Sequence, residues 1–170
     1  NEFQRMLNKY DNIQTFQIAD AKELAKIEKQ VADCNLLILS IHGEQNAEDE
    51  ALQKLIKAKN TILVFFTSPY ELDRYKISIE NAQAVVLAQD NNPAAAKSAA
   101  QGIFGGIPLK GKLQVSAASF PLNTGIETNK TRLAYNLPEE VGIRSEALAR
   151  IEEIAREGIK NRAYPGCQIL

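Results

Sequence analysis

The chain has 170 residues, of which 45% are hydrophobic and 24% charged, and its formal net charge is −1. This length can hold one domain and the beginning of a second. The sequence offers no basic field for a phosphate backbone, so we expect no nucleic acid partner. It also has no run of about 18 apolar residues, so we expect no membrane contact by this chain.

Strands and helices are predicted to alternate along the first half of the sequence. Ile13, Phe16 and Ile18 suggest a short strand, and Asp20 can cap a helix that reaches about Ala32. Three continuous apolar runs follow, of the kind expected for strands covered on both faces. These runs are residues 36–41, 61–66 and 84–88, and further helices are predicted at about 47–59 and 92–105.

A helix start is predicted with particular clarity after the second apolar run. Ser68 occupies the N-cap position, Pro69 the first helical position and Glu71 the third. This spacing is that of a capping box, in which the serine and glutamate side chains each bind a backbone N–H group. A short helix is therefore predicted between the second and third strands.

Beyond residue 105 the pattern changes. Residues 113–115 can form a last short strand, and residues 117–144 are predicted to be an extended connector interrupted by prolines and glycines. Ser145 is expected to cap a helix that reaches about Arg162, and a final strand should begin near Gly166. The chain opens at Asn1 without a methionine, and it closes within a strand just begun, which has no partner for its backbone groups, so both ends are expected to be cut.

Strands that alternate with helices at this spacing are typical of βαβ units with right-handed crossovers. We therefore predict a three-layer α/β sandwich around a mainly parallel sheet of the Rossmann or flavodoxin type. An extended linker and a C-terminal helix are expected to follow it.

The carboxyl ends of the predicted strands form the candidate binding edge, because ligands of open parallel sheets bind beyond these ends. The candidate substrate-binding residues there are His42, Glu44, Ser68, Tyr70 and Asp90. The alternative is that these loops are polar only because such residues cap helices, and the sequence leaves both interpretations open.

Acidic residues gather at the first of these loops, where Glu44, Glu48, Asp49 and Glu50 occur close together. A glycosidase needs two carboxyl groups, one on either side of the scissile bond. Acidic side chains at a helix start also stabilise its positive end. Without a second partner in a pocket we favour this structural role, and no residue is assigned as catalytic.

Metal, cofactor and nucleophile chemistry lacks its usual sequence signals. His42 is the single histidine, so no multi-histidine metal site can form, and we predict no metal and no cofactor. Neither GxSxG nor Ser-x-x-Lys is present. Residues 106–112 match half of a phosphate-binding loop, but Leu113 replaces the magnesium-binding hydroxyl, so we attribute the match to chance.

Three stretches of the first 117 residues together carry a resemblance to a known protein family. Residues 61–72 read TILVFFTSPYEL, residues 99–106 read AAQGIFGG and residues 110–116 read KGKLQVS. Together they resemble the C-terminal α/β domain of glycoside hydrolase family 3. The most similar branch is that of the β-N-acetylglucosaminidases of Bacteroides-like bacteria.

The remaining residues resemble the sequel found in one subset of those enzymes, the junction into a serine β-lactamase-like domain. The stretches that carry this resemblance are NTGI at 123–126, RLAY at 132–135, PEEVG at 138–142 and YPGCQIL at 164–170. The resemblance implies a family 3 domain over residues 1–117, a linker over 118–144 and the first helix and strand of a β-lactamase-like domain over 145–170.

The family resemblance also implies where catalysis occurs. The nucleophilic aspartate of the family lies in an N-terminal TIM barrel, which these residues do not include. In the β-glucosidases, a glutamate from the region matching residues 42–50 acts as acid/base. In the N-acetylglucosaminidases, a His-Asp pair on a barrel loop does so. The short loop here lacks the Gly-Asp-Arg stretch of the glucosidases and so resembles the second branch.

Three hypotheses follow. In the first, the chain is a non-catalytic accessory domain between a TIM barrel and a β-lactamase-like domain, in a periplasmic or membrane-anchored lipoprotein that hydrolyses β-linked N-acetylglucosaminides of glycans. In the second, Glu44 or Glu48 donates an acid proton to a β-glucosidase-type barrel. In the third, the chain is a stand-alone carbohydrate-binding module that uses the polar sheet edge.

Overall fold

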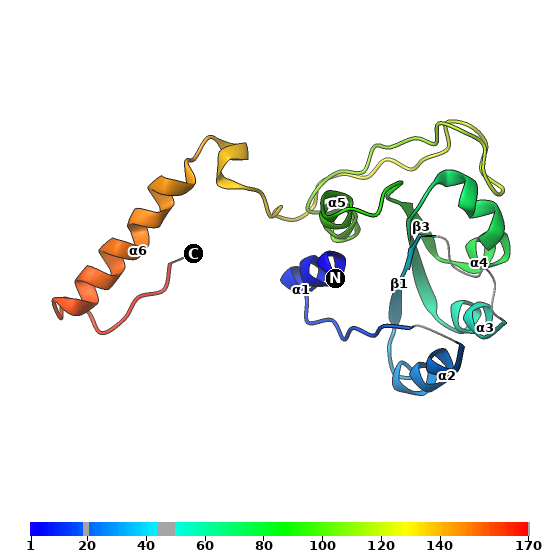
Figure 1. Ribbon diagram of the computed structural model, residues 1–170, viewed down its shortest axis with the longest axis horizontal. Coiled ribbons are helices and arrows are strands. Elements are labelled where there is room, and N and C mark those ends of the chain that lie inside the picture. Colours follow the sequence, from blue (N-terminus) through cyan, green and yellow to red (C-terminus); the bar gives the residue numbers. More distant parts are fainter. Residues whose placement is uncertain (19–20, 44–49, 170) are drawn as a thin grey trace. The chain divides into compact units, whose positions relative to one another are not determined.

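The computed structural model describes residues 1–18, 21–43 and 50–169 (Figure 1). The chain divides into two compact units, Asn1–Ala134 and Tyr135–Leu170. Residues 118–134 therefore belong to the first unit, whereas the domain ranges 1–117, 118–144 and 145–170 stay predictions.

Three parallel strands form the sheet of the first unit. β1 spans Leu36–His42, β2 spans Asn60–Phe66 and β3 spans Ala84–Leu87, in the order β1-β2-β3. The register places His42 beside Phe66, so the carboxyl ends of β1 and β2 meet at the same edge. With helices around this sheet, the predicted α/β fold class is confirmed.

Helices lie on both sides of the sheet (Figure 1). One side carries α1 and α5, which pack against each other, and the other carries α2, α3 and α4 with the short 3-10 helix η1. Their bounds are Glu2–Tyr10 for α1, Ala21–Gln30 for α2, Glu50–Ala58 for α3, Pro69–Tyr75 for η1, Lys76–Asn81 for α4 and Pro93–Ile103 for α5.

Alternate residues of the central strand β2 pack into two separate hydrophobic cores. Val64 faces α1 and α5, whereas Leu63 and Phe65 face the core that includes α3, η1 and α4. All three side chains are fully buried, at 0% exposed. This alternation is the two-residue period of a strand covered on both faces.

The first helix, α1, was not among the predicted elements. The Asn1 side chain accepts a hydrogen bond from the Gln4 N–H, and the Gln4 side chain accepts one from the Asn1 amino group, which completes a capping box. Phe3, Met6 and Leu7 are buried on one helical face. Residues 13–18 are extended but belong to no strand, so the short strand predicted there is wrong.

The predicted helix start at Ser68 is only partly correct. The Ser68 hydroxyl accepts a hydrogen bond from the Tyr70 N–H, and Pro69 is the first helical residue. The Glu71 carboxylate instead binds the Arg74 guanidinium at 2.9 Å, so it does not complete a capping box. The segment begins as the 3-10 helix η1 and becomes α-helical only at Lys76.

Residues 105–134 run out from α5 and fold back along themselves, and we call this segment the excursion. The Leu113 N–H donates to the Thr124 carbonyl at 2.9 Å, and the Asn123 N–H donates to the Leu113 carbonyl at 2.8 Å. Closer to α5, the N–H groups of Thr131 and Arg132 both donate to the Gly105 carbonyl. Leu113 thus pairs within this excursion and not with the sheet, and the strand predicted at 113–115 is wrong.

The second unit contains the short 3-10 helix η2 (Pro138–Val141) and the helix α6 (Ser145–Lys160). The Ser145 side chain does not cap α6 as predicted, because Ser145 is already helical and its N–H donates to the Glu139 carboxylate at 2.9 Å. Residues 166–169 form no strand, and Leu170 lies outside the described residues, so the predicted terminal strand is not observed.

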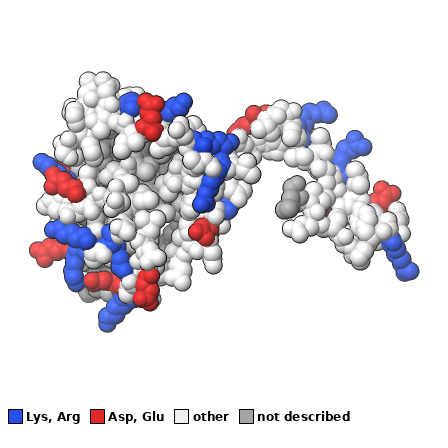
Figure 2. Space-filling model, turned by 180° about the vertical axis from the view of Figure 1, so that it is seen from behind, with Lys and Arg blue, Asp and Glu red and all other residues white. Residues whose placement is uncertain are grey.

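The surface of the first unit mixes both charges. On the face that Figure 2 shows, basic and acidic side chains are interspersed and neither forms a continuous patch there. Within the part of the chain that the structure describes, no helix has the length and apolar character needed to span a membrane.

Candidate functional site

His42 is the centre of the polar cluster at the carboxyl edge of the sheet. It is the last residue of β1, and its ring stacks on Phe66 of β2 with ring centroids 4.6 Å apart and planes 8° from parallel. Its Nδ1 lies 2.9 Å from Asn91 Oδ1, and its Nε2 lies 3.2 Å from Ser40 Oγ. The ring therefore ties β1 to the loop after β3.

The loop between β3 and α5 is held by its own side chains. Gln89 adopts a left-handed conformation with φ of 58°. Asp90 then accepts hydrogen bonds from the Asn91 N–H at 2.7 Å and from the Asn92 side chain at 2.6 Å. Asn92 in turn caps α5 by accepting from the Ala95 N–H. Asp90 therefore shapes the loop that presents Asn91 to His42.

Ser68 and Tyr70 lie on the neighbouring loop after β2. The Ser68 hydroxyl is used as the N-cap of η1, and the side chain of Tyr70 is 66% exposed. Among the described residues, no hydrogen bond joins either side chain to the His42 cluster. Of the five predicted binding residues, the structure thus links His42 and Asp90 through Asn91, and it leaves Ser68 and Tyr70 apart from them.

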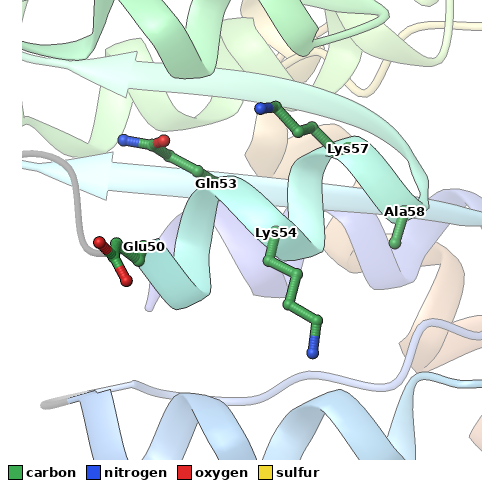
Figure 3. Close-up of a pocket in the computed structure, with 5 residues that line it drawn as sticks. All are labelled: Glu50, Gln53, Lys54, Lys57 and Ala58. Carbon is green, nitrogen blue, oxygen red and sulfur yellow. The ribbon is translucent and has the colours of Figure 1, made fainter.

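The predicted acidic cluster cannot be placed as a group. Glu44, Glu48 and Asp49 lie outside the described residues. Glu50 is the first residue of α3, and it lines an open hollow together with Gln53, Lys54, Lys57 and Ala58 (Figure 3). All five residues come from one helix, and Lys54 pairs with Glu28 of α2 at 3.1 Å. This hollow lies over the outer side of α3 and offers no pair of facing carboxyl groups.

Ser40, His42 and Asn91 are joined in the order hydroxyl, imidazole and amide. A nucleophile, a base and an orienting group are joined in the same order in a catalytic triad. In hydrolases of this type the nucleophile is exposed at a pocket beside oxyanion-hole donors. Ser40 instead lies inside β1, two residues before His42 on the same face of the strand. The two described hollows lie elsewhere, over α3 and beside residues 14–16. We therefore interpret the cluster as a structural network.

Residues 106–112 do not form a phosphate-binding loop. The backbone of Gly106 lies directly against the Tyr10 ring, and the residues that follow Lys112 form no helix before Pro138. The Lys112 ammonium group binds the Gly125 carbonyl at 2.7 Å and the Glu127 carboxylate at 3.2 Å within the excursion. Among the described residues, no group of three or more His, Cys, Asp or Glu side chains could hold a metal ion.

Among the partners of His42, sequence reasoning missed Ser40, Phe66, Asn91 and the Asn1 side-chain amide, whose nitrogen lies 3.5 Å from Nε2. Ser40 could have been found from the two-residue period of β1, because residues 40 and 42 share a face. Phe66 required the register of β1 on β2, which the apolar runs alone do not fix. Asn91 required the conformation of the loop around Gln89.

Comparisons with models of protein families, with curated proteins and with solved structures found no match to this chain. The fold defines the class of the first unit as an α/β domain with a parallel sheet. The resemblance to glycoside hydrolase family 3 accordingly rests on the sequence stretches alone.

Proposed function

We propose that this chain is a non-catalytic accessory domain of a glycoside hydrolase family 3 enzyme that acts on β-linked N-acetylglucosaminides. The observation that carries this proposal is the position of residues 99–106, the stretch that bears the more specific part of the resemblance. They form the end of α5 and the turn after it, and Ala99 and Ala100 are buried in the core. The stretch is used for packing.

The two glycines of this stretch support a scaffolding role. Gly105 has a φ of 75°, and a side-chain carbon there would overlap the Thr131 hydroxyl. A side-chain carbon on Gly106 would overlap the hydroxyl of Tyr10. Gly105 is therefore needed where residues 131–134 return to the body of the domain, and Gly106 is needed where the same turn meets Tyr10 of α1. At both positions the backbone closely approaches a side chain of another segment, and neither glycine lines a described hollow.

The polar edge of the sheet supports the same reading. His42 and Asp90 are the predicted binding residues that lie closest together there. The polar atoms of both side chains form hydrogen bonds with neighbouring loop and strand residues. Side chains engaged in this way position loops. In the parent enzyme this edge would present a fixed surface to the barrel domain.

The wider setting belongs to the same proposal. The partners would be an N-terminal TIM barrel and a C-terminal β-lactamase-like domain of one protein, and the substrate would reach the barrel. The location would be the periplasm, or the membrane surface through a lipoprotein anchor. These statements depend on the sequence resemblance.

The gene on either side of residues 1–170 tests the proposal first, because it must encode a TIM barrel upstream. The purified chain and the protein encoded by the whole gene are then assayed with a chromogenic N-acetyl-β-glucosaminide. We expect turnover by the whole protein and none by the chain. Absence of a barrel sequence, or turnover by the chain itself, would overturn the proposal.

A further inference from the structure

The strand β1 has the composition of a central strand but lies at the edge of the sheet. Its sequence, LLILSIH, contains no Asp, Glu, Lys or Arg, no proline and no glycine. Among the described residues β1 pairs with β2 alone. Edge strands in native sheets are normally protected by charges, prolines or bulges, since an open edge can recruit another strand. β1 carries none of these devices.

Burial also distinguishes β1 from its neighbour. In β2 the residues from Leu63 to Phe66 are all buried at 1% exposure or less, whereas in β1 only Ile41 is buried. Leu36 is 50% exposed, and the apolar side chains that follow it are only partly covered. The apolar residues of β1 on both faces are therefore less covered than their composition predicts.

The direction of the backbone groups identifies the open edge. The Gly43 N–H donates to the Phe66 carbonyl, so odd-numbered residues of this strand direct their backbone groups toward β2. Backbone groups alternate sides along a strand, so those of Ile38 and Ser40 face away from β2. They form a row of donors and acceptors along the outer edge of β1.

The handedness of the connections shows what belongs at this edge. The crossovers from β1 to β2 and from β2 to β3 run through helices on one face, and each moves the chain in the same direction across the sheet. The helix α2 packs with α3 on that face. Residues 13–18 form no strand in the described structure, but if they paired as one, the right-handed rule would place them on the β1 side of the sheet, because they lead into α2.

The helix α1 lies on the opposite face, beside α5. A right-handed crossover on this face moves the chain in the reverse direction. A strand that leads into α1 and continues to residues 13–18 must therefore lie between residues 13–18 and β1. This is the flavodoxin-like order, in which the first strand lies between the second and third.

We infer that the outer edge of β1 is the binding site for one additional parallel β-strand, supplied by polypeptide that leads directly into α1. This strand is apolar on both faces, like β1, because α1 would cover one face and α2 the other. On its far side it would pair with residues 13–18, where Phe16 is 36% exposed and Ile18 is 42% exposed. The inference does not depend on the proposed glycosidase context.

The test adds such a strand to the chain. A prefix of about seven alternating valine and isoleucine residues, with a short glycine-aspartate loop, is joined to Asn1. A prefix of the same length made of serine and glycine is the matched control. Amide hydrogen exchange is followed residue by residue at dilute concentration, with sedimentation to report the oligomeric state. Leu39 and Ile41 are internal references, because their N–H groups already face β2.

We expect the Ile38 and Ser40 amides to exchange rapidly in the 170-residue chain and in the control. In the apolar-prefixed protein they should slow by about 100-fold or more, while Leu39 and Ile41 change less. Ser40→Pro in the prefixed protein should abolish the slowing at Ile38, because proline removes an outward N–H and blocks the added strand.

Three results would overturn the inference. The first is slow exchange of Ile38 and Ser40 in the monomeric 170-residue chain, which would mean that its own residues cover the edge. The second is protection that depends on concentration and accompanies dimer formation, which would make a second copy the occupant. The third is equal exchange in the apolar-prefixed protein and the serine-glycine control.

Discussion

The imidazole of His42 lies flat against the ring of Phe66, with centroids 4.6 Å apart, and its Nδ1 simultaneously lies 2.9 Å from Asn91 Oδ1. One side chain therefore couples the ends of β1 and β2 to the loop that precedes α5. Stacked aromatic pairs contribute about 0.5–1.5 kcal/mol beyond area burial, and a hydrogen bond contributes a similar net amount.

This coupling predicts graded effects of substitution at His42. His42→Ala should lower the free energy of unfolding by about 1–3 kcal/mol, since it removes both the stacking and the hydrogen bonds. His42→Phe keeps a ring on Phe66 and should lose less. Urea unfolding measures both. Equal stability of the alanine variant and the original chain would show that the cluster contributes nothing.

The glycines give a second prediction. Gly105→Ala should destabilise the domain by about 1–3 kcal/mol, because alanine would have to hold a φ of 75° and would overlap the Thr131 hydroxyl. Gly111→Ala is the matched control, since nothing lies within 4 Å of a side-chain carbon there. Thermal unfolding of the two variants should separate them clearly. Similar melting temperatures would contradict the scaffolding role assigned to this turn.

The core of the sheet predicts a larger effect. Leu63→Ala removes a side chain that is 0% exposed and should cost about 2–5 kcal/mol of unfolding free energy. Leu133→Ala changes a side chain that is 86% exposed and should stay within about 0.5 kcal/mol. Denaturant unfolding of both variants checks the assignment of β2 as the buried central strand. A small effect at Leu63 would be incompatible with it.

Glu139 predicts a dependence on pH at the start of α6. The hydrogen bonds from Ser145 lower the pKa of the Glu139 carboxyl group below its ordinary value. A lowered folded-state pKa means that the stabilisation is present above the unfolded-state pKa and is lost as the pH falls through the folded one. Helix content of α6 should therefore decrease as the pH falls below the ordinary glutamate pKa of 4.5 and through the lowered pKa of Glu139.

Glu139→Gln is the control for this titration. Glutamine cannot ionise, so the variant should begin α6 less well at neutral pH and should lack the acidic transition at the Ser145 amide. Amide chemical shifts of Ser145 and its helical neighbours measure both effects. An unchanged acidic transition in Glu139→Gln would assign it to another carboxyl group.

The sheet was predictable because its signal is local. The runs at 36–41, 61–66 and 84–88 are continuous and apolar, and each is found as a strand with ends shifted by only a residue or so. Asn92 and Pro93 likewise fix the start of α5, since a capping amide and a proline act within one turn.

The errors arise where a pattern depends on partners elsewhere. Residues 13–18 alternate like a strand, but a strand needs a neighbour to pair with, and the described residues supply none. Residues 113–115 have strand-like side chains and pair with the returning excursion instead. At Ser145 the cap comes from Glu139, six residues earlier, through the fold of η2. The helix α1 did carry a local signal, in Asn1, Gln4 and its apolar face.

The candidate site was predictable in place but not in detail. The rule that ligands bind beyond the carboxyl ends of parallel strands led to His42 and Asp90, which do lie at this edge, and ligand binding by them stays a prediction. Their actual partners depend on strand register and on a left-handed residue at Gln89, neither of which the sequence pattern specifies.

The accessory role is tested most directly by the turnover rate of the whole enzyme after Glu44→Gln and Glu48→Gln. If this domain lends no acid/base group to the barrel, each variant should hydrolyse the N-acetylglucosaminide with a kcat within about threefold of the original enzyme, since a general acid is worth about 100-fold or more. A loss of about 100-fold in either variant would contradict that role and assign the proton donor to this domain.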